Sequence, residues 1–146
     1  MPSDRVALVT GASRGLGAVI ARHLAGAGWS VAVNYRSDAD GAGRVVDDIR
    51  RAGGVAAGYA ADVTDEDAVA ELMARAGREL GPVLGVVANA TGPQPIVPLD
   101  RLSWQDYLDQ LVFFVKSPTL LVQAVLPAMR AHAFGRVILI GSGLGD

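Results

Sequence analysis

The stretch that decides the fold of this chain is Val6-Ala7-Leu8-Val9-Thr10-Gly11-Ala12-Ser13-Arg14-Gly15-Leu16-Gly17. Its apolar residues predict a buried strand, and the glycines after them predict a tight turn into a helix over residues 18–27. Glycine at such a turn allows a pyrophosphate to approach the helix N-terminus, where free N–H groups and the helix dipole favour anions. A strand before the turn and a helix after it are the context that a phosphate-binding motif requires. The alternative is a turn that only joins a strand to a helix.

Downstream of this unit, short apolar runs alternate with longer amphipathic segments. The apolar runs predict further strands at residues 30–35, 55–60, 84–88 and 137–140. The amphipathic segments predict helices at 40–52, at 65–80 with Thr64 as N-cap, and from 103 to about 132 with a kink or break at Pro118. Buried strands that alternate with helices are typical of a parallel sheet covered on both faces. We therefore expect an α/β, doubly wound fold.

The composition of the 146-residue chain excludes several classes of protein. Hydrophobic residues make up 51% and charged residues 19%, which is too apolar for a disordered segment. The 13 basic and 15 acidic residues are scattered, so we expect no nucleic-acid partner. Cysteine is absent and only His23 and His132 occur, so we expect no disulfide and no metal site. We find no signal peptide and no apolar stretch of about 18 residues, which favours a cytoplasmic protein without a membrane partner.

Four short motifs at the ends of predicted strands resemble those of the short-chain dehydrogenase/reductase family. The turn Thr10-Gly11-x-x-x-Gly15-x-Gly17 matches that family's spacing, and Asp62-Val63 follows the third strand, where the family places the acid that meets the adenine ring. Ala88-Asn89-Ala90-Thr91 follows the fourth strand, with two substitutions in the family's Asn-Asn-Ala-Gly, and Gly141-Ser142 ends the fifth. The resemblance implies a Rossmann-like NAD(P)-binding domain over residues 1–146, with five strands in the order 3-2-1-4-5.

The resemblance also implies a reaction and a set of site residues. It implies hydride transfer between NADPH and a carbonyl or secondary alcohol, on a small-molecule or acyl-chain substrate, in a protein that forms a homo-oligomer when full length. Within the family the chain is most similar to 3-oxoacyl-(acyl-carrier-protein) reductases. Ser142 would orient the substrate as a catalytic residue. The residues implied to bind the cofactor are Gly11, Ser13, Arg14, Gly15, Leu16, Arg36, Asp62, Val63, Asn89 and Ala90.

The end of the second predicted strand favours NADP over NAD. In dinucleotide folds an acid at this position usually accepts the ribose 2′-hydroxyl of NAD. Here the strand ends Asn34-Tyr35-Arg36, and an arginine can bind a 2′-phosphate with charge-assisted hydrogen bonds. Arg14 points to the same region in family members that use NADP. Asp38 and Asp40 lie slightly further on and could bind the ribose of NAD instead.

The tyrosine and lysine that move the proton in this family are absent from the chain. A free phenol is a poor base at neutral pH, so the family sets its tyrosine beside a lysine in a Tyr-x-x-x-Lys pair shortly after the serine. None of the tyrosines here has a lysine four residues later, and the only lysine is Lys116. We therefore expect the N-terminal part of a longer protein, inactive as this fragment. The apolar strand at 137–140, which should be buried on both faces, would otherwise be left under-covered at a sheet edge.

The role of one residue that departs from the family's pattern, and two alternative classes of protein, are left open by the sequence. Phe114 stands where the family keeps an asparagine that supports a proton-relay water, so the relay is rearranged, the reaction is slower, or Phe114 faces the core. The chain could also be a non-catalytic NADP-binding module, complete as it stands. A doubly wound domain for another adenine nucleotide, such as a methyltransferase, shares the Gly-rich turn, but Ser142 and the Asn89 region count against it.

Overall fold

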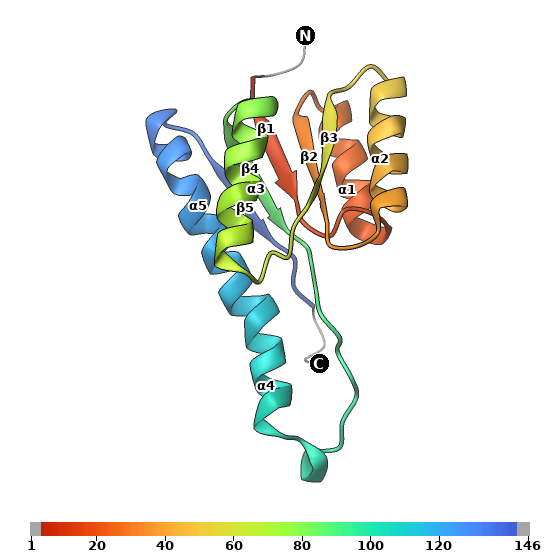
Figure 1. Cartoon of the computed structure of the whole chain (residues 1–146), viewed down its shortest axis with the longest axis vertical. Helices are drawn as coiled ribbons and strands as arrows, with labels where there is room; N and C mark the ends of the chain where they lie inside the picture. Colours follow the sequence, from red (N-terminus) through yellow and green to blue (C-terminus); the bar gives the residue numbers. More distant parts are fainter. Residues whose placement is uncertain (1–3, 143–146) are drawn as a thin grey trace.

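The computed structural model describes residues 4–142, which form one parallel sheet with helices on both faces (Figure 1). The sheet has five strands in the order β3-β2-β1-β4-β5, which confirms the predicted doubly wound, Rossmann-like fold. The strands are β1 (Val6–Val9), β2 (Ser30–Tyr35), β3 (Ala56–Ala60), β4 (Val83–Ala88) and β5 (Arg136–Leu139). The helices are α1 (Gly15–Gly26), α2 (Ala39–Arg51), α3 (Glu66–Glu79), the short 3-10 helix η1 (Leu99–Arg101), α4 (Trp104–Leu111), the π-helix η2 (Val112–Lys116) and α5 (Ser117–Ala131).

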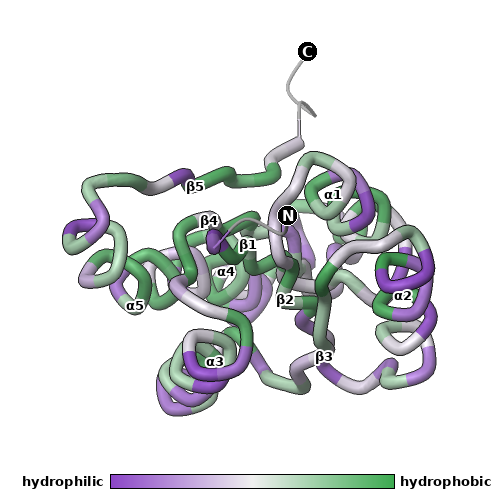
Figure 2. Tube along the Cα trace, turned by 90° about the horizontal axis from the view of Figure 1, so that it is seen from above, coloured by the Kyte–Doolittle hydropathy of each residue, from purple (hydrophilic) through white to green (hydrophobic). Residues whose placement is uncertain are grey.

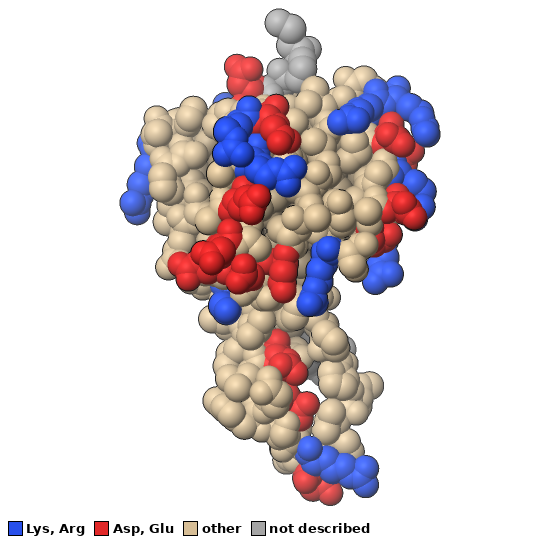
Figure 3. All heavy atoms as spheres, in the orientation of Figure 1, with Lys and Arg blue, Asp and Glu red and all other residues tan. Residues whose placement is uncertain are grey.

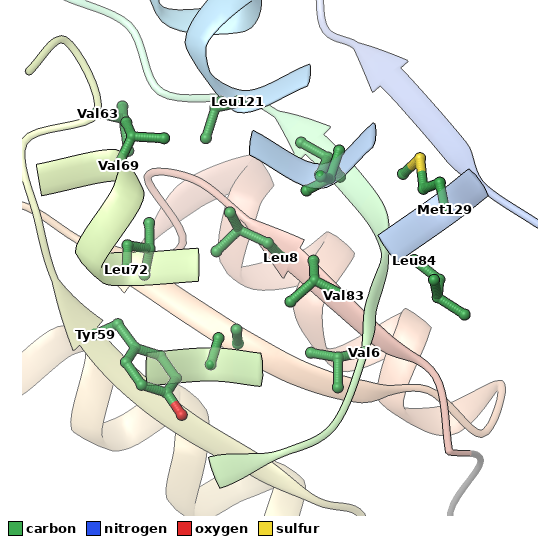
Figure 4. Packing of buried hydrophobic residues seen from close by; sticks show 14 residues of the cluster. Val6, Leu8, Tyr59, Val63, Val69, Leu72, Val83, Leu84, Leu121 and Met129 are labelled. Atoms are coloured by element: carbon green, nitrogen blue, oxygen red, sulfur yellow. The ribbon is translucent and has the colours of Figure 1, made fainter. Parts of the chain in front are cut away.

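The core lies in two layers, one on each face of the sheet. Strands β1, β2 and β4 are buried on both faces, as their continuous apolar runs predict. On one face α1 and α2 pack with residues such as Val45 and Ile49 against the sheet. On the other face α3 and α5 bring Leu72 and Leu121 against Leu8 (Figures 2 and 4). Because all strands are parallel, their carboxyl ends meet at one edge of the sheet, where the predicted site residues lie.

The starts of two helices differ from the sequence-based prediction. Helix α1 begins at Gly15 rather than at residue 18, because the end of the Gly-rich turn already forms its first turn. Helix α3 is capped by Asp65, whose carboxylate accepts from the Ala68 N–H at 2.9 Å, and not by Thr64. The Thr64 hydroxyl donates instead to Asp62 at 2.6 Å, and it accepts from no N–H of α3.

The predicted break at Pro118 takes the form of a π-helix directly before it. Helix α4 passes through η2 into α5 without interruption, and Pro118 lies in the first turn of α5. A proline lacks an N–H and its ring crowds the carbonyl four residues earlier, so one widened turn absorbs the conflict. The result is a helical run of 28 residues, Trp104–Ala131, whose most apolar window has a mean hydropathy of 1.6.

That run is long and apolar enough to cross a membrane by length and composition alone. The expectation that no apolar stretch reaches this length is therefore wrong, because Lys116 and Pro118 interrupt the apolar sequence but not the helix. The α5 half packs against β4 and α3 with Leu121 and Val125 buried, as a helix of a globular core does. The α4 half and the loop before it project from the body and carry few charges, whereas both signs of charge are mixed on the body in the same view (Figure 3).

Strand β5 is the most exposed strand in the described part of the chain. The expectation of burial on both faces is wrong for this structure: Val137, Ile138 and Leu139 are 42%, 49% and 62% exposed. Within residues 4–142 the strand pairs only with β4, and none of its four residues is buried. None of the described strands pairs with the outer edge of β5, so its backbone N–H and C=O groups on that side are left without strand partners.

Candidate cofactor-binding site

The Gly-rich turn between β1 and α1 has a backbone that favours glycine. Gly11 and Gly15 have φ angles of +60° and +59°, in the left-handed region. Gly17 has an ordinary φ, but a Cβ there would collide with the Gly11 carbonyl oxygen and come within 2.6 Å of Asn89 Nδ2. The turn is therefore wound closely against the end of β4.

Two side chains at the end of the sheet hold this turn from the β4 side. The Thr10 hydroxyl accepts from the Asn89 and Ala90 N–H groups at 3.0 and 2.9 Å, and it donates to the Val87 carbonyl at 3.4 Å. The Asn89 amide donates to the Thr10 and Gly11 carbonyls at 3.1 and 3.2 Å. The carbonyls at the start of the turn are thereby satisfied within the protein.

The N-terminus of α1 is arranged for an anion. The N–H groups of Gly15, Leu16 and Gly17 have no acceptor in the described part of the chain, and no side chain caps the helix. No acidic residue stands in its first turn. Unpaired N–H groups and the positive end of the helix dipole together favour a phosphate.

A cleft of about 650 Å³ opens beside this helix end. It gathers all of the predicted cofactor residues except Leu16, which is 54% exposed and lies outside the lining. Residues from the ends of β1, β2, β3 and β4 contribute, as expected for the carboxyl edge of a doubly wound sheet. The predicted residues in the lining are Gly11, Ser13, Arg14, Gly15, Arg36, Asp62, Val63, Asn89 and Ala90.

One end of the cleft is defined by Arg36 and Asp62. The Asp62 carboxylate accepts from the Thr64 hydroxyl and N–H, and these bonds hold the pKa of Asp62 below its ordinary value. The positive charges of Arg36 and Lys116 act in the same direction. The Arg36 guanidinium lies 3.9 Å from Asp62 and is largely exposed, so it remains free to turn toward a ligand. No carboxylate occupies the tip of β2, and Asp38, which also lines the cleft, caps α2 through the Gly41 N–H.

The other end of the cleft contains residues that sequence analysis did not assign to the cofactor. The Phe113 ring lines the cleft beside Gly92, where a Cβ would collide with that ring. Phe114 is partly exposed, so the alternative that it faces the core is wrong. Ser142 follows β5, is exposed and does not line the cleft. Residues 4–142 hold no group of three or more His, Asp or Glu side chains placed to bind a metal.

Asn34 is a cleft residue that the motifs did not predict, although the sequence contains a signal for it. Asn34 lines the cleft and is 2% exposed, although it lies in the otherwise apolar end of β2. A buried amide must find hydrogen-bond partners, so a polar residue in such a strand indicates a specific contact. Gly92 and Phe113 carried no such signal, because their contact joins a loop to a helix about 20 residues away.

A doubly wound parallel sheet with an anion-binding turn after β1 and a cleft at its carboxyl edge defines a dinucleotide-binding type of domain. Residues 5–146 match the model of the short chain dehydrogenase family. The chain belongs to this family.

Curated relatives and solved structures agree with that assignment. A cis-4-hydroxycyclohexanecarboxylate dehydrogenase of Sinomonas cyclohexanicum is 38% identical over 98% of this chain and 57% of its own length. A 3-oxoacyl-[acyl-carrier-protein] reductase of Staphylococcus epidermidis is 34% identical over 97% of this chain and 58% of its own length. A metagenomic short-chain oxidoreductase crystallised with NADP superimposes with a TM-score of 0.88, at 35% identity over 99% of this chain and 65% of that one. The chain spans about half the length of the curated relatives it matches.

Proposed function

We propose that this chain is the cofactor-binding part of an NADP-dependent oxidoreductase that interconverts a carbonyl and a secondary alcohol. The observation that carries the proposal is the pairing of an open helix N-terminus with two arginines, Arg14 and Arg36, on one cleft whose β2 tip has no carboxylate. The helix end suits a pyrophosphate, and an arginine suits the 2′-phosphate that distinguishes NADP from NAD. Solved relatives that contain NADP or NADPH support this choice.

The residues present fit the cofactor. The close approach that Gly11, Gly15 and Gly17 permit leaves room for a pyrophosphate at α1. Arg14 and Arg36 would hold the 2′-phosphate, and Asp62, Val63, Asn89 and Ala90 would contact the adenosine and the second ribose. NADPH supplies a hydride when bound. Ser142 would orient the substrate oxygen, but the chain holds no Tyr-x-x-x-Lys pair to move the proton.

The substrate follows from the class of reaction only in part. The names of the relatives span a 4-hydroxycyclohexanecarboxylate, a tetrahydroxynaphthalene and a 3-oxoacyl group, each of which carries a hydroxyl or oxo group on a carbon ring or chain. A role like that of the 3-oxoacyl reductases is the finer proposal, with a small-molecule or acyl-chain substrate. The exposed Trp104 and Tyr107 of α4 support an interface between copies of the full-length protein in the cytoplasm.

Titration of the 146-residue chain tests the cofactor assignment. We expect NADPH to bind more tightly than NADH, and S-adenosylmethionine not to compete, with intrinsic NADPH fluorescence as the signal. Arg36→Asp should shift the ratio of the two affinities toward NADH by about tenfold or more, because a carboxylate repels the 2′-phosphate. Arg101→Asp, which makes the same charge change at η1 away from the cleft, is the matched control. If the ratio of NADPH to NADH affinity is unchanged in Arg36→Asp, the assignment of Arg36 to the 2′-phosphate is wrong.

The sequence of the gene beyond Asp146 tests the proposal that this is the N-terminal part of an enzyme. A Tyr-x-x-x-Lys shortly downstream would support it, and the longer protein should then oxidise NADPH with a carbonyl while the 146 residues alone do not. A stop codon at that point would favour the non-catalytic NADP-binding module instead.

A further inference from the structure

Asn34 is the most deeply buried polar side chain that lines the cleft. It lies near the carboxyl end of β2, where the neighbouring positions of the strand are apolar, and only 2% of its surface is exposed. Burying an amide costs free energy unless its donors and acceptor are satisfied. Both polar atoms of its side chain have partners, which, apart from the Tyr35 carbonyl of β2 itself at 3.4 Å, belong to segments on the two sides of β2.

On one side, Asn34 holds the Gly-rich turn. Its side-chain oxygen accepts from the Gly11 N–H at 3.2 Å, and its own backbone carbonyl accepts from the Ala12 N–H at 2.8 Å. Two consecutive N–H groups of the turn therefore point at one residue of β2. Gly11, with a φ of +60°, is also one of the two glycines of the turn in the left-handed region.

On the other side, Asn34 is anchored to the end of β3. Its amide nitrogen donates to the Tyr59 and Ala61 carbonyls, both at 3.2 Å. The side chain thus presents an acceptor to the Gly-rich turn and donors to the end of β3. An amide supplies both, whereas a carboxylate, a hydroxyl or an alkyl group does not reproduce this pattern in full. An aspartate would keep the bond from Gly11 but would face two carbonyl oxygens.

We propose that Asn34 is a positioning residue for the pyrophosphate, acting through the Gly-rich turn; this inference rests on the proposed dinucleotide function. Asn89 satisfies the carbonyls of residues 10 and 11 from the β4 side, and Asn34 satisfies the N–H groups of residues 11 and 12 from the β2 side. With these groups occupied, the N–H groups of the turn that have no acceptor in residues 4–142 are those of Ser13 and Arg14 and, at the start of α1, those of Gly15, Leu16 and Gly17. Fixing the turn aims these donors at the pyrophosphate before it binds.

The first test needs no cofactor. Hydrogen exchange by NMR of the Gly11 amide should accelerate by about tenfold or more in Asn34→Ala, because that N–H loses its acceptor. The amides of Val31 and Val33 in the same strand should change by less than about twofold relative to the parent. Asn34→Asp keeps the acceptor for the Gly11 N–H. In that variant the exchange rate of Gly11 relative to those of Val31 and Val33 should stay as in the parent, even where the variant is less stable. Val69→Ala, a buried substitution in α3, is the control for a general loss of stability, which accelerates all these amides together.

The second test separates the pyrophosphate from the adenosine end. Asn34→Ala should weaken binding of 2′-phospho-ADP-ribose by about tenfold and binding of adenosine 2′-monophosphate by less than about twofold. A uniform acceleration of exchange, or an equal loss for both ligands, would overturn the positioning role. If the parent chain binds neither ligand, the proposed function fails, and the exchange of Gly11 still decides whether Asn34 fixes the turn.

Discussion

Gly17→Ala tests whether the Gly-rich turn is as tightly wound as the structure indicates. Alanine in place of glycine inside a helix ordinarily stabilises a protein by about 1 kcal/mol. Gly17 is the third residue of α1, yet a Cβ there would collide with the Gly11 carbonyl oxygen, lie 2.6 Å from Asn89 Nδ2 and lie 3.0 Å from Ala12 Cα. Two of these three atoms belong to the backbone, so no side-chain rotation relieves the overlap.

The magnitude follows from the atoms that must move. Forcing an extra methyl group into a packed site costs about 1–3 kcal/mol. Displacing the Asn89 amide also weakens its bond to Gly11, which is worth about 1 kcal/mol and offsets the gain in helix propensity. We therefore expect Gly17→Ala to lower the free energy of unfolding by about 1–3 kcal/mol, which corresponds to a fall in Tm of several degrees, on the order of 2–4 °C per kcal/mol.

Urea unfolding followed by circular dichroism measures this change, and NADPH titration of the same sample measures its effect on the site. Gly43→Ala is the matched control, because Gly43 lies within α2 and a Cβ there meets nothing within 4 Å. That variant should gain up to about 1 kcal/mol and bind NADPH as the parent does. A Gly17→Ala protein as stable as the parent would refute the close approach of the turn to Asn89.

Two further predictions concern the ionisable side chains of Tyr59 and Asp62, which take no part in the proposed proton or hydride transfer. Tyr59→Phe should cost about 1 kcal/mol in urea unfolding at neutral pH, because the Tyr59 hydroxyl donates to the Glu79 carboxylate at 2.8 Å. Burial raises the pKa of Tyr59 and the bond to Glu79 raises it further, so the parent should lose stability above about pH 10, where the unfolded chain ionises first, and Tyr59→Phe should lose less. Thr64→Val should raise the pKa of Asp62 toward its ordinary value in an NMR titration, because one of the two donors to that carboxylate is lost. In the parent the stability contributed by Asp62 is present above about pH 4 and lost as pH falls through its lowered pKa; an identical titration in the variant would contradict this account.

The sequence predicts those parts of the site that depend on local pattern. The turn at Gly11–Gly17 follows from apolar residues, glycines and a helix in succession, and the structure folds it as expected. The α3 cap was assigned to Thr64 instead of Asp65 because both residues are good caps, and only the contact of Thr64 with Asp62 decides between them. The side chain of Asn34 bonds to residues 11, 59 and 61, which lie 23 to 27 residues away along the chain, so its role emerges only when β2 packs between β1 and β3.

The part of the site proposed to bind the cofactor and the part proposed to bind the substrate differ in how firmly the chain holds their residues. The end of β1 and the first residues of the Gly-rich turn are held from both sides by the side-chain amides of Asn34, which is buried, and of Asn89, so the turn proposed to meet the pyrophosphate is held by contacts within the protein. Within residues 4–142, Ser142 has no such support, because β5 is exposed and Ser142 does not line the cleft. A cleft whose donors are already aligned binds without a large ordering cost, whereas catalysis needs the reacting groups held to within a fraction of an ångström. Cofactor binding should therefore be separable from turnover. We expect the 146-residue chain to bind NADPH saturably and to reduce no carbonyl.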